Sequence, residues 1–202
     1  MGFKETDVQV VLKSKEIIQL DKSTFKNLNK IEGIYLTDNL LTDIDNGTFE
    51  GLTKLNTISL EFNIINNINS GLLNTLNNLQ YLKLNCNQIK TIDRSAFNGL
   101  YNLRSLDLSN NLIKIIEPCL FGDLMNLLSL YLGNNLIKGI DQVSLSGLVS
   151  CESLDLHGNF IKLFKAGTFS QMNKLKYLDI LENPLEAFDG SAGEFDDVEV
   201  SV

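Results

Sequence analysis

Apolar residues recur along this chain in a frame of 24 positions. In residues 103–126, apolar side chains fall at places 1, 4, 6, 11, 14, 19 and 22, and an asparagine falls at place 9. The same frame fits from positions 31, 55, 79, 127 and 151, and in part from positions 7 and 175. Self-similarity at a fixed period of about 20–29 residues is typical of proteins built from stacked repeats.

Each unit is predicted to contain a short strand followed by a longer return stretch. Places 4 and 6 are apolar and place 5 is mostly polar, which is the period-two alternation of a half-buried strand. The strands of successive units then stack about 4.8 Å apart in one parallel sheet. Because the return stretch is longer than the strand, we expect a curved solenoid of about eight units with the sheet on its concave side.

The repeat frame divides the chain into an arm, a solenoid and a tail. We assign these parts to residues 1–6, 7–189 and 190–202. The solenoid is subdivided into an N-terminal capping repeat, six regular repeats and a truncated C-terminal repeat, at residues 7–30, 31–174 and 175–189. The first repeat is irregular, with Asp7 and Lys15 at places that are apolar or Asn elsewhere, as expected of a repeat with one face in water.

The C-terminal end carries two further expectations. The ring of Phe188 is expected to shield the last layer of the core, and residues 190–193 are expected to form a flexible joint. The alternating valines of residues 198–202 give a weak strand signal. This strand would cover the open edge of the stack, pair with another molecule or stay disordered.

The pattern LxxLxLxxNxLxxIxxxxFxxL, seen over residues 103–126, resembles the "typical" subclass of leucine-rich repeats. Such repeats are found in the ectodomains of Toll-like receptors, in Slit and in small leucine-rich proteoglycans, and the resemblance covers residues 8–188. It implies an α/β solenoid, a curved leucine-rich repeat stack with a parallel concave sheet. It also implies a non-enzymatic role in protein recognition, with innate immunity or cell-surface recognition as the expected setting.

Two columns of residues are interpreted as structural. The asparagines at place 9 are Asn39, Asn63, Asn87, Asn111, Asn135, Asn159 and Asn183. Each amide is expected to bond to the backbone of its own and the adjacent turn, because an unpaired buried amide costs roughly 1–3 kcal/mol. The residues at place 19 are Phe25, Phe49, Leu73, Phe97, Phe121, Leu145 and Phe169, which are expected to fill the space behind the sheet.

The charge of the chain bears on the class of partner. The formal net charge is −8, and six acidic residues without a basic one occupy the last 17 positions. Without those six, 19 acidic residues face 17 basic ones. An acidic chain without a broad basic surface argues against nucleic acid and anionic membranes as partners. There is also no run of roughly 18 apolar residues to span a membrane.

The cysteines and a glycosylation motif bear on the compartment. Three cysteines give no disulfide framework. Cys151 is predicted to be a buried thiol, and Cys86 and Cys119 are predicted to lie too far apart to pair. The motif that begins at Asn46 is a candidate glycosylation site on an exposed return stretch. We expect an extracellular or secreted protein, although the absence of cysteine-rich caps and of a signal segment makes a cytoplasmic scaffold or adaptor the alternative.

No catalytic, cofactor-binding or metal site is predicted. His157 is the one histidine, and Asp155 and Asp179 occupy the same place in adjacent repeats. A carboxylate pair needs a pocket and raised pKa values for acid–base catalysis, and an open sheet provides neither. The alternative that His157, Asp155, Asp179 and Glu182 hold a metal ion is less favoured than an ordinary polar surface.

A column of lysines runs along one flank at place 12. Its members are Lys90, Lys114, Lys138 and Lys162. Asp93, Glu117 and Asp141 follow the first three of them by three residues. We interpret this flank as a solvated surface whose opposite charges largely cancel.

The concave face is the predicted binding surface. Four of the five tyrosines fall on it, and tyrosine offers a large contact area with few rotatable bonds. The predicted contact residues are Tyr35, Ser59, Tyr81, Lys83, Arg104, Asp107, Tyr131, Asp155, His157, Tyr177 and Asp179. The C-terminal half of the face is acidic through Glu152, Asp155, Asp179 and Glu182, so we expect a protein ligand with a basic patch. The alternatives are an ordinary sheet surface and self-association.

Overall fold

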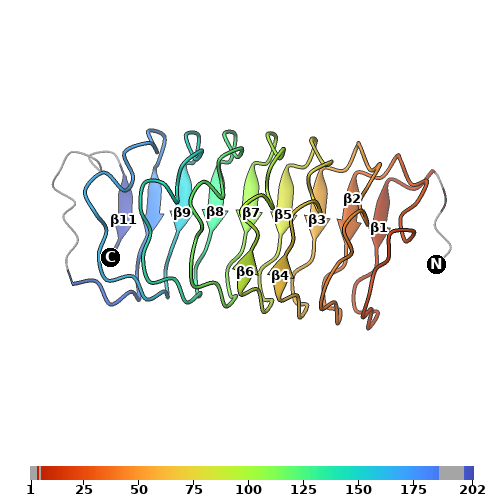
Figure 1. The fold of residues 1–202 in the computed structure, drawn as a ribbon, viewed down its shortest axis with the longest axis horizontal. Coiled ribbons are helices and arrows are strands. Elements are labelled where there is room, and N and C mark those ends of the chain that lie inside the picture. The colour runs from red at the N-terminus through yellow and green to blue at the C-terminus, as the bar shows by residue number, and fades with distance from the viewer. Residues whose placement is uncertain (1–3, 5, 187–197) are drawn as a thin grey trace.

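The computed structural model describes residues 4, 6–186 and 198–202, and it consists of one main sheet and its return stretches. Nine strands form the sheet and follow one another in chain order, all parallel (Figure 1). They are β1 (Gln9–Val11), β2 (Gly33–Tyr35), β3 (Thr57–Ser59), β5 (Tyr81–Lys83), β7 (Ser105–Asp107), β8 (Ser129–Tyr131), β9 (Ser153–Asp155), β10 (Tyr177–Asp179) and β11 (Glu199–Ser201).

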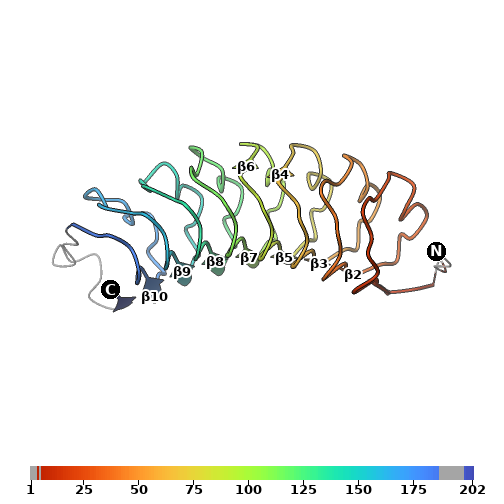
Figure 2. The same ribbon diagram turned by 90° about the horizontal axis from the view of Figure 1, so that it is seen from below.

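The register of the sheet confirms the 24-residue frame. Place 4 of each repeat lies beside place 4 of the next, as in the pairs Val10–Ile34 and Leu82–Leu106. The place-4 side chains of all eight repeats are buried, whereas the residues at places 3 and 5 are mostly half-buried or exposed. Figure 2 shows the stack as an arc with the sheet on its inner side. The curved leucine-rich repeat stack with a parallel concave sheet is therefore confirmed.

The return stretches on the outer side consist of turns and extended segments. Although an α/β class allows helices here, the described residues contain none. Two neighbouring return stretches pair with each other, because β4 (Asn67–Ile68) lies parallel to β6 (Thr91–Ile92) on the convex side (Figure 2). Within the part of the chain that the structure describes, no helix is long and apolar enough to cross a membrane.

The core fills the space between the sheet and the return stretches. All seven residues at place 19 are buried, and the rings of Phe25 and Phe49 stack with centroids 6.0 Å apart. Cys151 is a fully buried thiol, as predicted. Burial raises the pKa of its thiol to about 12, so the group stays protonated at neutral pH, and its Sγ donates to the Ser153 carbonyl at 3.2 Å.

The asparagines at place 9 join adjacent repeats through their side-chain amides. Asn111 donates through Nδ2 to the carbonyls of Leu84 and Leu108, both at 3.0 Å, and accepts through Oδ1 from the amide of Ile89 at 2.9 Å. One bond stays within the repeat and two cross to the preceding one. The same three-way arrangement occurs at the other six asparagines of the column.

The residue at place 8 of each repeat has a left-handed backbone, and in seven of the eight repeats it precedes an asparagine of this column. Place 8 has a φ between +53° and +60° in all eight repeats, although only one of these residues is a glycine. They are Ser14, Asp38, Phe62, Cys86, Asn110, Asn134, Gly158 and Glu182. This conformation is costly for a non-glycine residue. The turn recurs whatever the residue type, so the stack imposes it, and in seven repeats it precedes the asparagine that enters the core.

The last strand closes the C-terminal edge of the sheet. β11 pairs with β10, and Val200 lies beside Leu178 in register. Of the alternatives for residues 198–202, the structure thus supports the one in which they cover the edge of the eighth repeat. The expectations for Phe188 and residues 190–193 lie outside the described residues.

Candidate functional site on the concave face

The tyrosines of the concave face differ in how far they are exposed. Tyr81, Tyr131 and Tyr177 are exposed to 43%, 36% and 54%. Tyr35 is instead half-buried. Its ring lies over Gly33, where an added β-carbon would be 2.8 Å from it. Three of the four tyrosines therefore present their rings to a ligand.

Ser59 lies on the concave face as predicted and lines the hollow over its N-terminal half, but it offers little surface of its own. The side chain is only 3% exposed. Its hydroxyl bonds to the carboxylate of Glu61, and the Thr37 hydroxyl lies 2.9 Å away. Glu61, which follows β3 and was not among the predicted contact residues, is half-buried and shares this point of the face with Ser59.

A hollow of about 550 Å³ lies over the N-terminal half of the sheet. It extends over β1, β2, β3 and β5, and Tyr35 and Tyr81 line it together with Lys13, Lys83 and Glu61. Aromatic rings, two ammonium groups and one carboxylate thus share this surface. It is a shallow region of a broad face, which suits a macromolecular partner better than a small enclosed substrate.

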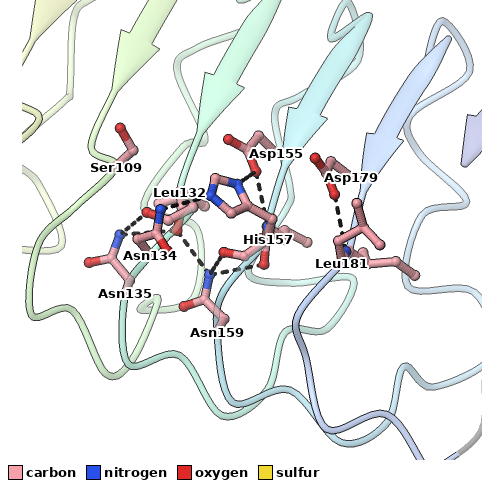
Figure 3. A network of polar contacts seen from close by, with 12 residues as sticks. Ser109, Leu132, Asn134, Asn135, Asp155, His157, Asn159, Asp179 and Leu181 are labelled. Carbon is pink, nitrogen blue, oxygen red and sulfur yellow. Dashed lines mark hydrogen bonds and ion pairs between the residues drawn. The ribbon is translucent and has the colours of Figure 1, made fainter. Parts of the chain in front are cut away.

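A polar cluster lies over the C-terminal half and is centred on His157 (Figure 3). The imidazole Nδ1 lies 2.6 Å from Oδ1 of Asp155, and Nε2 lies 2.7 Å from Nδ2 of Asn134. The side chain of Asp179, from the next strand, points toward the same region (Figure 3). His157 is therefore held from both of its ring nitrogens.

The protonation of His157 reflects this environment. Partial burial lowers its pKa, but the hydrogen bond to Asp155 and the negative charges of Asp155, Asp179 and Glu182 together raise the pKa above the ordinary value of 6.5. The imidazolium form is therefore stabilised. As a cation, it offsets part of the negative charge of this half of the face.

The three aspartates at place 5 share a local role that was not predicted from the repeat pattern. In each, Oδ1 accepts the backbone amide two residues on, at 3.0 Å for Asp107, 2.9 Å for Asp155 and 3.0 Å for Asp179. The carboxylate thus caps the end of its strand. The recurring Leu-Asp pair was the available signal, because an aspartate side chain readily bonds to the backbone two residues on.

The C-terminal half is less acidic than its carboxylates suggest. Glu152 forms an ion pair with Lys176 at 2.8 Å, and the two occupy place 2 of adjacent repeats. Asp155 contacts His157. Asp107, Asp179 and Glu182 remain without an ion pair among the described residues. Arg104 is exposed beside β7, where the two halves of the face meet.

The cluster has three groups that could approach a metal ion. Donor atoms of Asp155, His157 and Asp179 lie within 4.8 Å of one another. However, Nδ1 of His157 already contacts Asp155, and its Nε2 contacts Asn134. Two of the three groups, Asp155 and His157, are thus already joined in a hydrogen-bonded clamp.

Comparison with known proteins agrees with the repeat architecture. A model of the leucine rich repeat matches residues 9–65, 53–113, 77–137, 102–161 and 125–185. The chain belongs to the leucine-rich repeat family. Proteins of this family are typically non-enzymatic recognition modules, and this chain shares their solenoid.

A crystal structure of TLR13 in complex with ssRNA13 has a similar fold. Its TM-score is 0.85 and its sequence identity is 28%, over 90% of this leucine-rich repeat chain and 26% of the TLR13 chain. The present chain thus spans about a quarter of the length of that relative. Among curated proteins, none matches this sequence. The resemblance to Toll-like receptor ectodomains is thereby confirmed at the level of the fold.

Proposed function

We propose that this leucine-rich repeat chain binds a protein ligand through its concave face. The observation that carries the proposal is the exposure of Tyr81, Tyr131 and Tyr177 along one side of a continuous sheet. Exposed tyrosines are enriched at protein interfaces, where they bury much area at little cost in conformational entropy. Their spread over β5 to β10 favours an extended contact.

The charges of the face suggest the polarity of the ligand. The N-terminal half carries Lys13 and Lys83, whereas the C-terminal half carries the unpaired carboxylates of Asp107, Asp179 and Glu182. A protein with a basic patch would face the C-terminal half, and complementary charge raises the rate of association and fixes its orientation. The mixed charge favours a protein over nucleic acid, whose binding needs a continuous basic surface.

The test compares two double variants of the same chain. A protein ligand is first selected from a displayed library of small domains, with the wild-type chain as bait. Tyr131→Ala/Asp179→Ala should then bind that ligand at least tenfold more weakly, whereas Tyr101→Ala/Glu50→Ala, which alters exposed residues outside the concave strands, should bind as well as wild type. Equal loss in both variants, or in neither, would contradict the proposal.

A direct titration with a single-stranded RNA oligonucleotide distinguishes the two ligand classes. The solved neighbour is a TLR13 complex with RNA, and this ligand belongs to that protein. We expect no saturable RNA binding by the present chain at physiological salt. Saturable binding that is lost in Lys13→Ala/Lys83→Ala would replace the protein ligand with a nucleic acid.

We further propose an extracellular setting, with innate recognition as the role. The similarity to a Toll-like receptor supports it, and Asn46 is exposed and able to accept a glycan. An intracellular scaffold is the alternative. The intact mass of the protein expressed from its native gene in a eukaryotic host decides between them. A glycosylated chain in the medium supports the proposal, and an unglycosylated cytosolic chain with free thiols overturns it.

A further inference from the structure

A groove on the convex side of the solenoid forms where the paired return stretches end. β6 pairs with β4 on one side, and within the described residues no strand pairs with its other edge. In the following repeat the chain turns at Pro118, which has no N–H to donate. A cavity of about 440 Å³ lies between β6 and this next return stretch. Its volume is within the range of about 300–1,000 Å³ that is usual for small-molecule sites.

The walls of this groove, which we call the convex groove, are apolar. Ile92 of β6 lies on one side, and Leu112, Ile115 and Leu136 lie on the other. Ile115 is 69% exposed, more than any other large apolar side chain among the described residues. A single exposed isoleucine needs no explanation, but an exposed isoleucine beside half-buried leucines and a cavity marks a binding surface.

Two ammonium groups lie at the edge of the convex groove. Lys90 and Lys114 line it, and neither forms an ion pair with a described residue. The carboxylate of Asp93 accepts hydrogen bonds from the amide and hydroxyl of Ser95, both at 3.0 Å, and forms no ion pair with Lys90. Glu117 is the one acid among the residues that line the groove. Two ammonium groups and one carboxylate therefore line the groove itself, and its lining carries a net positive charge.

We propose that the convex groove binds a small amphiphile with one carboxylate, of the class of medium-chain fatty acids. Its hydrocarbon chain lies between Ile92 and Ile115, and its carboxylate contacts the ammonium groups of Lys90 and Lys114. The charge complementarity selects an anion, and the apolar walls select a chain over a compact polar anion. β6, which forms one wall of the groove, lies on the side of the arc opposite the concave sheet (Figure 2), so the groove leaves that sheet free for a protein ligand.

The test uses the full chain and a fluorescent apolar anion, 1-anilinonaphthalene-8-sulfonate. Its fluorescence should rise on binding to the folded protein. Decanoate, below its micelle concentration, should then displace it, whereas decyltrimethylammonium, with the same chain length and the opposite charge, should be at least tenfold less effective. Equal displacement by the two would overturn the role of the lysines.

Matched variants locate the site. Ile115→Asp and Lys114→Glu should each weaken decanoate binding at least tenfold. Leu163→Asp and Lys138→Glu are the controls, because they occupy the same places in other repeats and do not line the convex groove. Circular dichroism confirms that each variant is folded. Equal weakening in the controls would overturn the proposal. A fall in the bound fraction of the probe as the protein concentration rises would also overturn it, because a second copy of the chain would then occupy the groove.

Discussion

The imidazole of His157 lies directly against the backbone of Gly133. A β-carbon at position 133 would be 2.4 Å from the Cε1 and Nδ1 atoms of the ring, which is closer than atoms can approach. Both residues occupy place 7 of adjacent repeats, so the absent side chain of one provides the space for the ring of the other. From this position the ring reaches Asp155 and Asn134 at the same time.

Replacing Gly133 by alanine should therefore displace the imidazole. Without its hydrogen bond to Asp155, His157 loses part of what raises its pKa, and the pKa should fall toward or below 6.5. Because the chain has one histidine, a proton NMR titration of the Cε1–H resonance reads this pKa without assignment. Gly139→Ala is the control, since a β-carbon at position 139 meets nothing within 4 Å. An unchanged titration in Gly133→Ala would show that the ring does not depend on this space.

The stability of the protein should depend on pH through the same histidine. The folded state raises the pKa of His157 above 6.5, so folding favours the protonated form. This contribution is fully present below about pH 6.5 and is lost as the pH rises through the higher pKa of the folded state. Urea unfolding followed by circular dichroism should thus show a fall in stability across this window for wild type. In His157→Gln the fall should be smaller, and identical pH profiles would contradict the linkage.

The sequence was sufficient to predict the fold because the repeat signal is redundant. An aliphatic residue at place 4 lies beside another aliphatic residue in every repeat, so an error in one repeat does not change the register. The left-handed turn at place 8 was not predicted. Phe62 and Cys86 have no preference for positive φ, and the conformation becomes apparent only from the stack that imposes it.

The candidate site was predicted less completely, because a strand position fixes the face of a side chain and not its contacts. The frame correctly placed Ser59 at the concave place 5, yet the adjacent Glu61 and Thr37 remove its hydroxyl from the surface. Likewise, the acidity of Glu152 is offset by Lys176, 24 residues away. Such pairs depend on rotamers, which the sequence pattern does not specify.

The asparagine column should contribute stability according to the burial of its partners. Asn111→Ala leaves two buried carbonyls and one buried amide without their partner, so we expect a loss of about 2–4 kcal/mol in the free energy of unfolding. Asn183→Ala breaks equivalent bonds in the half-exposed eighth repeat, where water can replace them, and should cost about 1 kcal/mol. Urea unfolding at constant pH measures both. Equal losses would mean that the burial of the partners does not decide the cost.

Two glycines at the same place of different repeats separate backbone strain from steric conflict. Gly51 and Gly147 both occupy place 21 with φ values of +80° and +93°. A β-carbon at Gly51 meets nothing within 4 Å, so Gly51→Ala should cost only the strain of the left-handed backbone, about 1 kcal/mol. A β-carbon at Gly147 would be 2.2 Å from the carbonyl oxygen of Phe121 in the preceding repeat. Because that oxygen belongs to the backbone and cannot rotate away, Gly147→Ala should force the two repeats apart and cost about 3 kcal/mol or more. Urea unfolding of the two variants compares these costs directly, and equal destabilisation would show that the repeats separate here without resistance.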